Sequence, residues 1–125
     1  MPKHLLSIFV FLTLSLLLFI ACGTEDTATD ETNKHIRLDI VENGNTTVKE
    51  ADTTQTTLLG LLEELNMVEG SMGEYGYLVS AINGVEADMD NNYWWMIYKD
   101  GAWTDSLDKQ KIADGETYVF KLEKV

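Results

Sequence analysis

Residues 93–101 are the most informative stretch of the chain, and they read Tyr93-Trp94-Trp95-Met96-Ile97-Tyr98-Lys99-Asp100-Gly101. Four of the first six residues are aromatic and the other two are Met and Ile, so both faces of a strand here would be apolar. One face can pack on the core of a small domain, whereas the other needs a helix, a loop, a partner chain or a ligand to cover it. Asp100-Gly101 favours a tight turn because both residues tolerate a left-handed backbone. The stretch therefore predicts a central strand that ends in a hairpin.

The segments before this strand predict a hairpin followed by one helix. Ile36–Val41 alternates apolar and charged residues, which is typical of a half-buried strand, and Thr46–Glu50 would be its return strand. Asn43-Gly44 between them is a strong two-residue hairpin signal. An N-cap region at Asp52–Thr57 and a leucine stripe at helical spacing then predict one amphipathic helix over about Thr56–Asn66.

The remaining segments complete a small sheet. Met67–Gly76 contains three glycines and is predicted to be a loop. Tyr77–Ile82, closed by the turn Asn83-Gly84, and Thr117–Leu122 are predicted strands. This order predicts an α+β fold, a small β-grasp-like domain in which one helix packs on a mixed or antiparallel sheet of about five strands. Other one-helix sheets also fit the order.

The N-terminus is typical of a bacterial lipoprotein. Residues 1–21 contain a basic start and an uncharged run of 16 residues from Leu5 to Ile20, shorter than the ~20 residues of a spanning helix, so we expect a signal peptide. An uncleaved transmembrane anchor is the alternative. Phe19-Ile20-Ala21-Cys22 resembles a lipobox, which implies that Cys22, the single cysteine of the chain, is lipidated. Residues 22–35 would then be a flexible tether and residues 36–125 the folded domain.

Composition argues against nucleic-acid binding and catalysis. The formal net charge is −12 and no basic patch is present, so phosphate backbones would be repelled. The two histidines, His4 and His35, lie in the signal peptide and at the end of the tether, which leaves no Ser-His or Cys-His pair in the domain. We therefore expect no enzyme, no catalytic residue and no cofactor, and we interpret the many carboxylates as a solvated surface.

An acidic segment, Asp88-Met89-Asp90-Asn91-Asn92, has alternating oxygen ligands like a calcium loop. The EF-hand pattern requires Gly at its sixth position and Glu at its twelfth, where this chain has Tyr93 and Lys99. A solvated loop is therefore expected and no metal site is assigned, with a loose Ca²⁺ site as the alternative.

Aromatic residues are the strongest functional signal. The predicted domain contains Trp94, Trp95 and Trp103, more indole than the core of a one-helix domain readily buries. We infer that at least one of them, Trp94 or Trp103, flanks a binding surface.

Several short motifs resemble a known family. They are Ser80-Ala81-Ile82-Asn83-Gly84, Tyr93-Trp94, Gly101 and Ile112-Ala113-Asp114-Gly115-Glu116. In this order they are similar to the C-terminal β-domain of transcobalamin and intrinsic factor, and to its bacterial surface relatives of unknown function. The resemblance is best over Tyr77–Leu122 and extends back to Ile36. It identifies residues 36–125 as a transcobalamin-like C-terminal domain.

The resemblance implies a ligand and a set of contacts. A corrinoid such as cobalamin, or a similar flat and amide-rimmed molecule, would be hydrogen-bonded by Ser80 and Asn83 and contacted by the apolar segment Tyr93-Trp94. The animal proteins close a helical barrel over the ligand, and this chain has none, so affinity should be weak unless a second protein or a dimer supplies the other side. The full set of expected ligand-binding residues is Tyr75, Ser80, Asn83, Tyr93, Trp94, Trp95 and Trp103.

The sequence thus predicts a lipid-anchored, extracytoplasmic binding module on a bacterial cell membrane. It would capture a corrinoid or another small ligand for a membrane transporter. The alternative is a surface protein-interaction module without a small-molecule ligand, and a carboxylate hydrolase is a third hypothesis.

Overall fold

The computed structural model describes residues 32–125, whose contacts form one compact unit from Asn33 to Val125. The expected signal peptide, the lipidation site Cys22 and most of the expected tether lie outside the described residues. Within residues 32–125, no helix has the length and apolar character needed to cross a bilayer.

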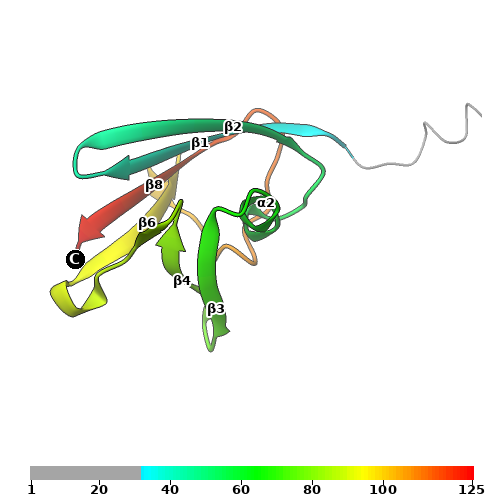
Figure 1. Ribbon diagram of the computed structural model, residues 1–125. Helices are drawn as coiled ribbons and strands as arrows, with labels where there is room; N and C mark the ends of the chain where they lie inside the picture. The colour runs from blue at the N-terminus through cyan, green and yellow to red at the C-terminus, as the bar shows by residue number, and fades with distance from the viewer. Residues whose placement is uncertain (1–31) are drawn as a thin grey trace, which may run out of the picture. The chain divides into compact units, whose positions relative to one another are not determined.

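The larger sheet has five strands in the spatial order β2-β1-β8-β6-β7 (Figure 1). Their bounds are β1 Lys34–Glu42, β2 Asn45–Thr53, β6 Tyr93–Lys99, β7 Ala102–Trp103 and β8 Thr117–Lys124. The first and last strands, β1 and β8, run parallel at the centre, and every other pair is antiparallel. The aromatic strand β6 is therefore internal, as expected, with β8 along one side and the short β7 along part of the other.

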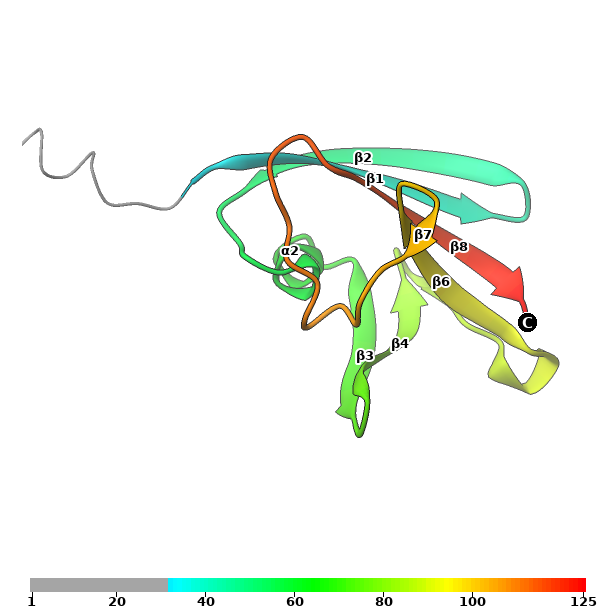
Figure 2. The same cartoon turned by 180° about the vertical axis from the view of Figure 1, so that it is seen from behind.

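A second, three-stranded sheet of order β3-β4-β5 stands against the larger one (Figures 1 and 2). It is formed by β3 Val68–Gly73, β4 Gly76–Ile82 and β5 Val85–Glu86. The helix α2, Leu58–Glu64, lies under the larger sheet beside β3, and a short 3-10 helix η1, Met89–Asn91, precedes β6.

Turn chemistry fixes the hairpins. Asn43-Gly44, Asn83-Gly84 and Asp100-Gly101 all adopt positive φ at both residues, between 47° and 80°. This is the geometry of two-residue turns that match the twist of antiparallel strands. The three turns predicted from the sequence are confirmed.

The core forms where the larger sheet meets α2. Alternate residues of β1 and β8 and the leucine stripe of α2 supply it, and its fully buried members include Ile36, Leu38, Leu58, Leu61, Leu62, Tyr118 and Phe120. The Thr57 hydroxyl caps α2 by accepting a 3.1 Å hydrogen bond from the Gly60 N–H. The leucine stripe is therefore core.

The structure is mostly strand with a single α-helix in residues 32–125, in agreement with the α+β prediction, but it differs in three respects. It has two sheets where one was expected. Residues 68–73, predicted to be a loop, form β3, an edge strand of largely exposed residues that pairs with β4 and therefore carries no apolar alternation. Strand β1 begins at Lys34, two residues before the expected start.

Candidate binding site

The two adjacent tryptophans of β6 lie on opposite faces of the strand. Trp95 pairs with Leu122 of β8 and points into the core, where it is 7% exposed and its indole N–H donates a 2.9 Å hydrogen bond to the Val85 carbonyl. Trp94 pairs with Glu123 and is 36% exposed. Strand alternation therefore buries one indole and presents the other.

Trp103 extends the exposed face across the hairpin. It lies opposite Tyr98 in the β6–β7 pair and is 72% exposed. The Tyr98 hydroxyl donates a 2.7 Å hydrogen bond to Glu123, which raises the tyrosine's pKa, and the Lys121 ammonium lies 5.7 Å from the ring centroid. These contacts fix Tyr98, whereas the large ring of Trp103 stays accessible.

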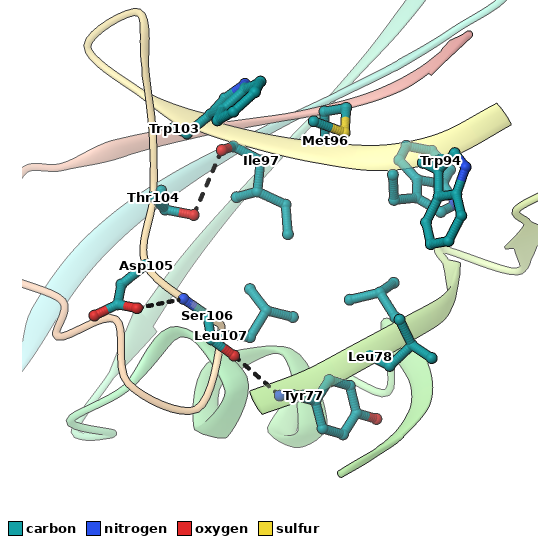
Figure 3. A pocket seen from close by; sticks show the side chains of 12 residues that line it. Tyr77, Leu78, Trp94, Met96, Ile97, Trp103, Thr104, Asp105, Ser106 and Leu107 are labelled. Atoms are coloured by element: carbon teal, nitrogen blue, oxygen red, sulfur yellow. Dashed lines mark hydrogen bonds between the residues drawn. The ribbon is translucent and has the colours of Figure 1, made fainter. Parts of the chain in front are cut away.

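A groove of about 280 Å³ lies between β6 and β4 (Figure 3). Its lining comes from β4, from β6 and from the segment after β7, and consists of Tyr77, Leu78, Val79, Trp94, Trp95, Met96, Ile97, Trp103, Thr104, Asp105, Ser106 and Leu107. Figure 3 places Trp103 and Trp94 at opposite ends, with Ile97 and Leu107 pointing into the space between the strands. The wall is thus mainly aromatic and aliphatic, with a few polar groups at one end.

The groove exists because β4 and β6 do not pair with each other. In residues 32–125, β5 covers the edge of β4 only at Ala81 and Ile82, and β7 covers the edge of β6 only at Tyr98 and Lys99. The strand edges between these pairs face each other without a strand in between. Some backbone groups of these edges are bonded to the loops around the groove, among them the Tyr77 N–H and the Ile97 carbonyl.

One end of the groove is closed by residues 104–108. The Thr104 N–H donates a 3.1 Å hydrogen bond to the Ile97 carbonyl on β6. The Tyr77 N–H on β4 donates to the Ser106 hydroxyl at 2.9 Å and to the Asp108 carboxylate at 3.0 Å. Hydrogen bonds from the Ser106 hydroxyl and the Tyr77 N–H lower the pKa of Asp108. The segment is thus bound to both strand edges.

Gly76 makes this closure sterically possible. Its φ is +120°, and a Cβ at this position would lie 2.2 Å from the Ser106 Oγ. Any side chain there would displace the hydroxyl that holds Tyr77.

The groove brings together three of the expected ligand-binding residues, namely Trp94, Trp95 and Trp103. Tyr75 is exposed in the turn between β3 and β4 and does not line it. Tyr93, at the start of β6, is not in the lining either. Its N–H donates to the Asp88 carbonyl, and its own carbonyl accepts from the Asp88 N–H.

The two polar residues implied by the family resemblance also lie outside the groove. Ser80 lines a separate hollow with the acidic residues Glu86, Asp88 and Asp90. Asn83 occupies a left-handed turn, φ 51°, and its N–H donates a 2.8 Å hydrogen bond to the Met67 carbonyl. A single ligand in the groove would therefore not contact Asn83 unless it extended along β4.

Sequence reasoning missed the wall formed by Leu78, Val79 and Leu107 and the closing segment 104–108. The apolar residues carry the ordinary strand pattern and give no binding signal of their own. The closing segment carries no strand or helix pattern, and nothing in its sequence indicates that Ser106 and Asp108 bond to a strand about thirty residues earlier.

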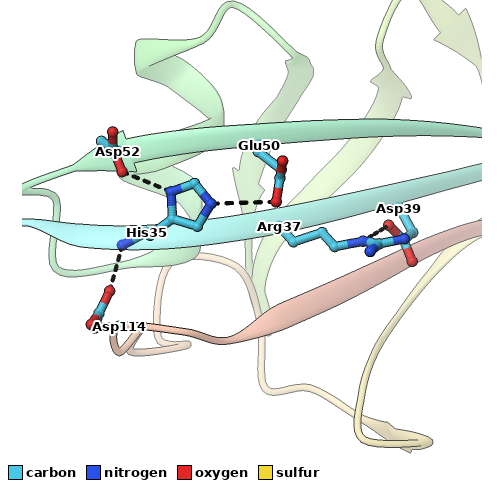
Figure 4. A network of polar contacts seen from close by, with 6 residues as sticks. All are labelled: His35, Arg37, Asp39, Glu50, Asp52 and Asp114. Carbon is cyan, nitrogen blue, oxygen red and sulfur yellow. Dashed lines mark hydrogen bonds and ion pairs between the residues drawn. The ribbon is translucent and has the colours of Figure 1, made fainter.

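Two polar networks lie away from the groove. His35 lies between Asp52, at 2.8 Å, and Glu50, at 3.3 Å, and these bonds raise its pKa (Figure 4). Glu116 binds Lys99 and accepts a 2.8 Å hydrogen bond from the Tyr118 hydroxyl. Burial alone would raise the pKa of Glu116, but these partners together lower it.

Neither network forms a metal site. In the described part of the chain, no three or more His, Cys, Asp or Glu side chains are grouped so that they could hold a metal ion. The acidic segment around Asp88 forms the single-turn helix η1, in which the Asn91 amide donates to the Asp88 carboxylate.

Comparison with known proteins places the chain in a family. Residues 55–124 match the family described as a domain of unknown function, DUF4430, and the chain belongs to it. A solved candidate metal-binding protein from Ruminococcus gnavus is similar, with 31% identity and a TM-score of 0.71, over 74% of this chain and 98% of that one.

Haptocorrin, solved in complex with Cbi, is similar in fold, with a TM-score of 0.63 and 14% identity over 77% of this chain and 26% of haptocorrin. No curated protein matches the chain. The expected likeness to the corrinoid-carrier C-terminal region is thus found in the fold.

Proposed function

We propose that this chain is a non-enzymatic binding module that holds a flat, largely apolar molecule in the groove between β4 and β6. The observation that carries the proposal is the groove itself, an apolar hollow bounded by the accessible rings of Trp94 and Trp103. Concave, mainly apolar sites with a few polar groups are the usual geometry of small-molecule recognition.

We propose a corrinoid as the ligand class. Haptocorrin is similar in fold to this chain and was solved in complex with Cbi. The parallel central pair β1 and β8, flanked by antiparallel strands and crossed by one helix, supports a β-grasp-like, transcobalamin-like domain. A ring system rimmed by amides could use the apolar wall and the polar side chains of Thr104, Asp105 and Ser106 at the closed end of the groove.

The size of the groove indicates that this chain supplies one side of a larger site. Its 280 Å³ lies just below the ~300–1,000 Å³ of typical ligand pockets, so a large macrocycle would remain partly exposed. We propose that a second protein, for example a membrane transporter, covers the other side. Lipidation at Cys22 would hold the domain at the outer face of a bacterial cell membrane, close to such a partner.

A protein-interaction role is the second candidate. Met72, Leu78 and Trp103 are exposed apolar residues on or beside the groove, and aromatic side chains with Met are enriched in protein interfaces. In this case the groove would accept a side chain of the partner rather than a free molecule.

Calorimetric titration distinguishes these functions. A soluble Cys22→Ser chain that starts at residue 22 would be titrated with cobinamide and with cobalamin. We expect saturable binding that weakens at least about tenfold in Trp94→Ala and Trp103→Ala, because each change removes a wall of the groove. Val48→Ala, an exposed apolar position on β2, is the matched control and should bind normally.

Absence of heat at high micromolar ligand would contradict the corrinoid proposal. Recovery of one membrane protein with the wild-type chain, and its loss with Trp103→Ala, would then support the protein-interaction role.

A further inference from the structure

The charged side chains that line the groove and its neighbour are all acidic. Asp105 is the single charged residue among those lining the groove. The next hollow along β4 is lined by Ser80 together with Glu86, Asp88 and Asp90. Neither lining includes Lys, Arg or His, and the chain as a whole carries a net charge of −12. The potential over this part of the surface is therefore negative.

Two lysines lie close to the groove without lining it. Lys121 is the β8 partner of Met96 in the groove wall and lies over the Tyr98 ring. Lys109 follows Asp108 and helps to lower the pKa of its carboxyl, so its charge is matched by a neighbouring carboxylate. Glu123, two residues from Lys121 on β8, faces the same side of the sheet. The three carboxylates of the second hollow have no basic residue among their lining neighbours.

We infer that the groove selects flat ligands by charge, binding planar ring systems that carry positive charge and rejecting anions of the same shape. This inference rests on the proposed small-molecule function and specifies its ligand class. The faces of Trp94 and Trp103 attract cations through the negative face of the indole ring. The surrounding carboxylates add attraction for a cation and repulsion for an anion.

Charge also argues against two other occupants of the groove. A second copy of the chain would bring its own net charge of −12 to the groove. The chain's own residues 22–31 contain Glu25, Asp26, Asp30 and Glu31 and no basic residue, so they too would be repelled. A small planar cation fits the volume, the aromatic walls and the sign of the field together.

Two three-ring dyes provide a matched test. 9-Aminoacridine is a cation at neutral pH and anthracene-9-carboxylate is an anion of similar size and shape. Each would be titrated into the Cys22→Ser chain from residue 22 by calorimetry, at low and at physiological salt. We expect the cation to bind at least about tenfold more tightly, with a preference that shrinks as salt is added.

Substitutions separate a groove effect from general attraction to an acidic protein. Asp105→Asn removes the single carboxylate of the groove lining, and Asp88→Asn removes one carboxylate of the neighbouring hollow. Each should reduce the preference for the cation. Glu42→Gln removes one charge at the turn between β1 and β2 and is the matched control, which should leave the preference unchanged. Trp94→Ala should weaken binding of the cation directly, because it removes one aromatic wall.

Equal affinity for the two dyes would overturn the charge inference and leave the groove proposal standing. A Glu42→Gln effect as large as that of Asp105→Asn would also overturn it, because the attraction would then be non-specific. If neither dye binds, the charge inference is overturned as well. The corrinoid proposal is tested separately, by whether cobinamide binds.

Discussion

Trp94 and Trp95 are neighbours in the chain and differ in almost every physical respect. Trp95 is enclosed by the core and its N–H is paired with the Val85 carbonyl, whereas Trp94 borders the groove with about a third of its surface in solvent. The same residue type thus serves stability on one face of β6 and is available for recognition on the other. The comparison teaches that an aromatic strand is informative only when its two faces are separated.

The largest expected effect is on the buried face. Trp95→Ala should lower the free energy of unfolding by about 3–5 kcal/mol, because it leaves a large cavity in the core. Urea denaturation followed by circular dichroism measures the change. Trp95→Phe keeps most of the packing but loses the bond to Val85, and should cost less. If Trp95→Ala were as stable as wild type, the distinction between the two faces would be wrong.

Gly76 tests whether the closed end of the groove is built as tightly as the core. Gly76→Ala should destabilise the domain by about 2–3 kcal/mol, because it adds strain at positive φ and a clash with the Ser106 hydroxyl. Gly44→Ala is the matched control, since its φ is also positive but a Cβ there meets nothing within 4 Å. Thermal denaturation of the pair isolates the clash, and equal melting temperatures would show that residues 104–108 move freely.

Glu116 tests the contribution of a carboxylate that is enclosed rather than exposed. Glu116→Gln should cost about 1–3 kcal/mol at neutral pH, since it weakens the bonds to Lys99 and Tyr118. The pKa of Glu116 is lowered from its ordinary value of 4.5, so the carboxylate stabilises the fold above that value. This contribution should be lost as the pH falls through the lowered value in the folded state.

Urea titrations of wild type and Glu116→Gln from pH 7 to pH 3 provide the measurement. The difference between them should shrink with acid. A difference that stayed constant down to pH 3 would mean that packing, and not charge, accounts for the role of Glu116.

How much of this could be read from the sequence depends on how local each signal is. The hairpins were predictable because Asn43-Gly44 and Asp100-Gly101 fix their own backbone, and the leucine stripe of α2 has a helical period. Strand β3 was not predictable, since its residues are exposed and are held in place by pairing with β4. The site was half predictable for the same reason: aromatic content indicated Trp94 and Trp103, whereas the closure by Ser106 depends on a contact distant in sequence.

The exposed face should behave oppositely to the buried one. Trp94→Ala should lower the free energy of unfolding by only about 1–2 kcal/mol, less than Trp95→Ala, because about a third of the side chain is already in solvent. The same variant should weaken binding of the proposed ligand at least about tenfold, so stability and binding separate in a single protein. Denaturation and calorimetry on one preparation measure both, and a loss of several kcal/mol would show that Trp94 belongs to the core.

The smallest expected effect concerns His35, which is exposed and paired rather than enclosed. Hydrogen bonds from the imidazole to Asp52 and then Glu50 raise its pKa above 6.5, so the protonated ring is favoured in the folded state. Its stabilising contribution is therefore present below pH 6.5 and is lost as the pH rises through the raised value.

Nuclear magnetic resonance can follow the His35 ring directly, because it is the single histidine of the chain from residue 22 onwards. Asp52→Asn should move the titration midpoint back towards 6.5, whereas Glu42→Gln, a matched loss of charge elsewhere on the same hairpin, should not. Equal midpoints in wild type and Asp52→Asn would mean that solvent screens the pair completely, and surface contacts such as this one would then contribute nothing comparable to the enclosed groups around β6.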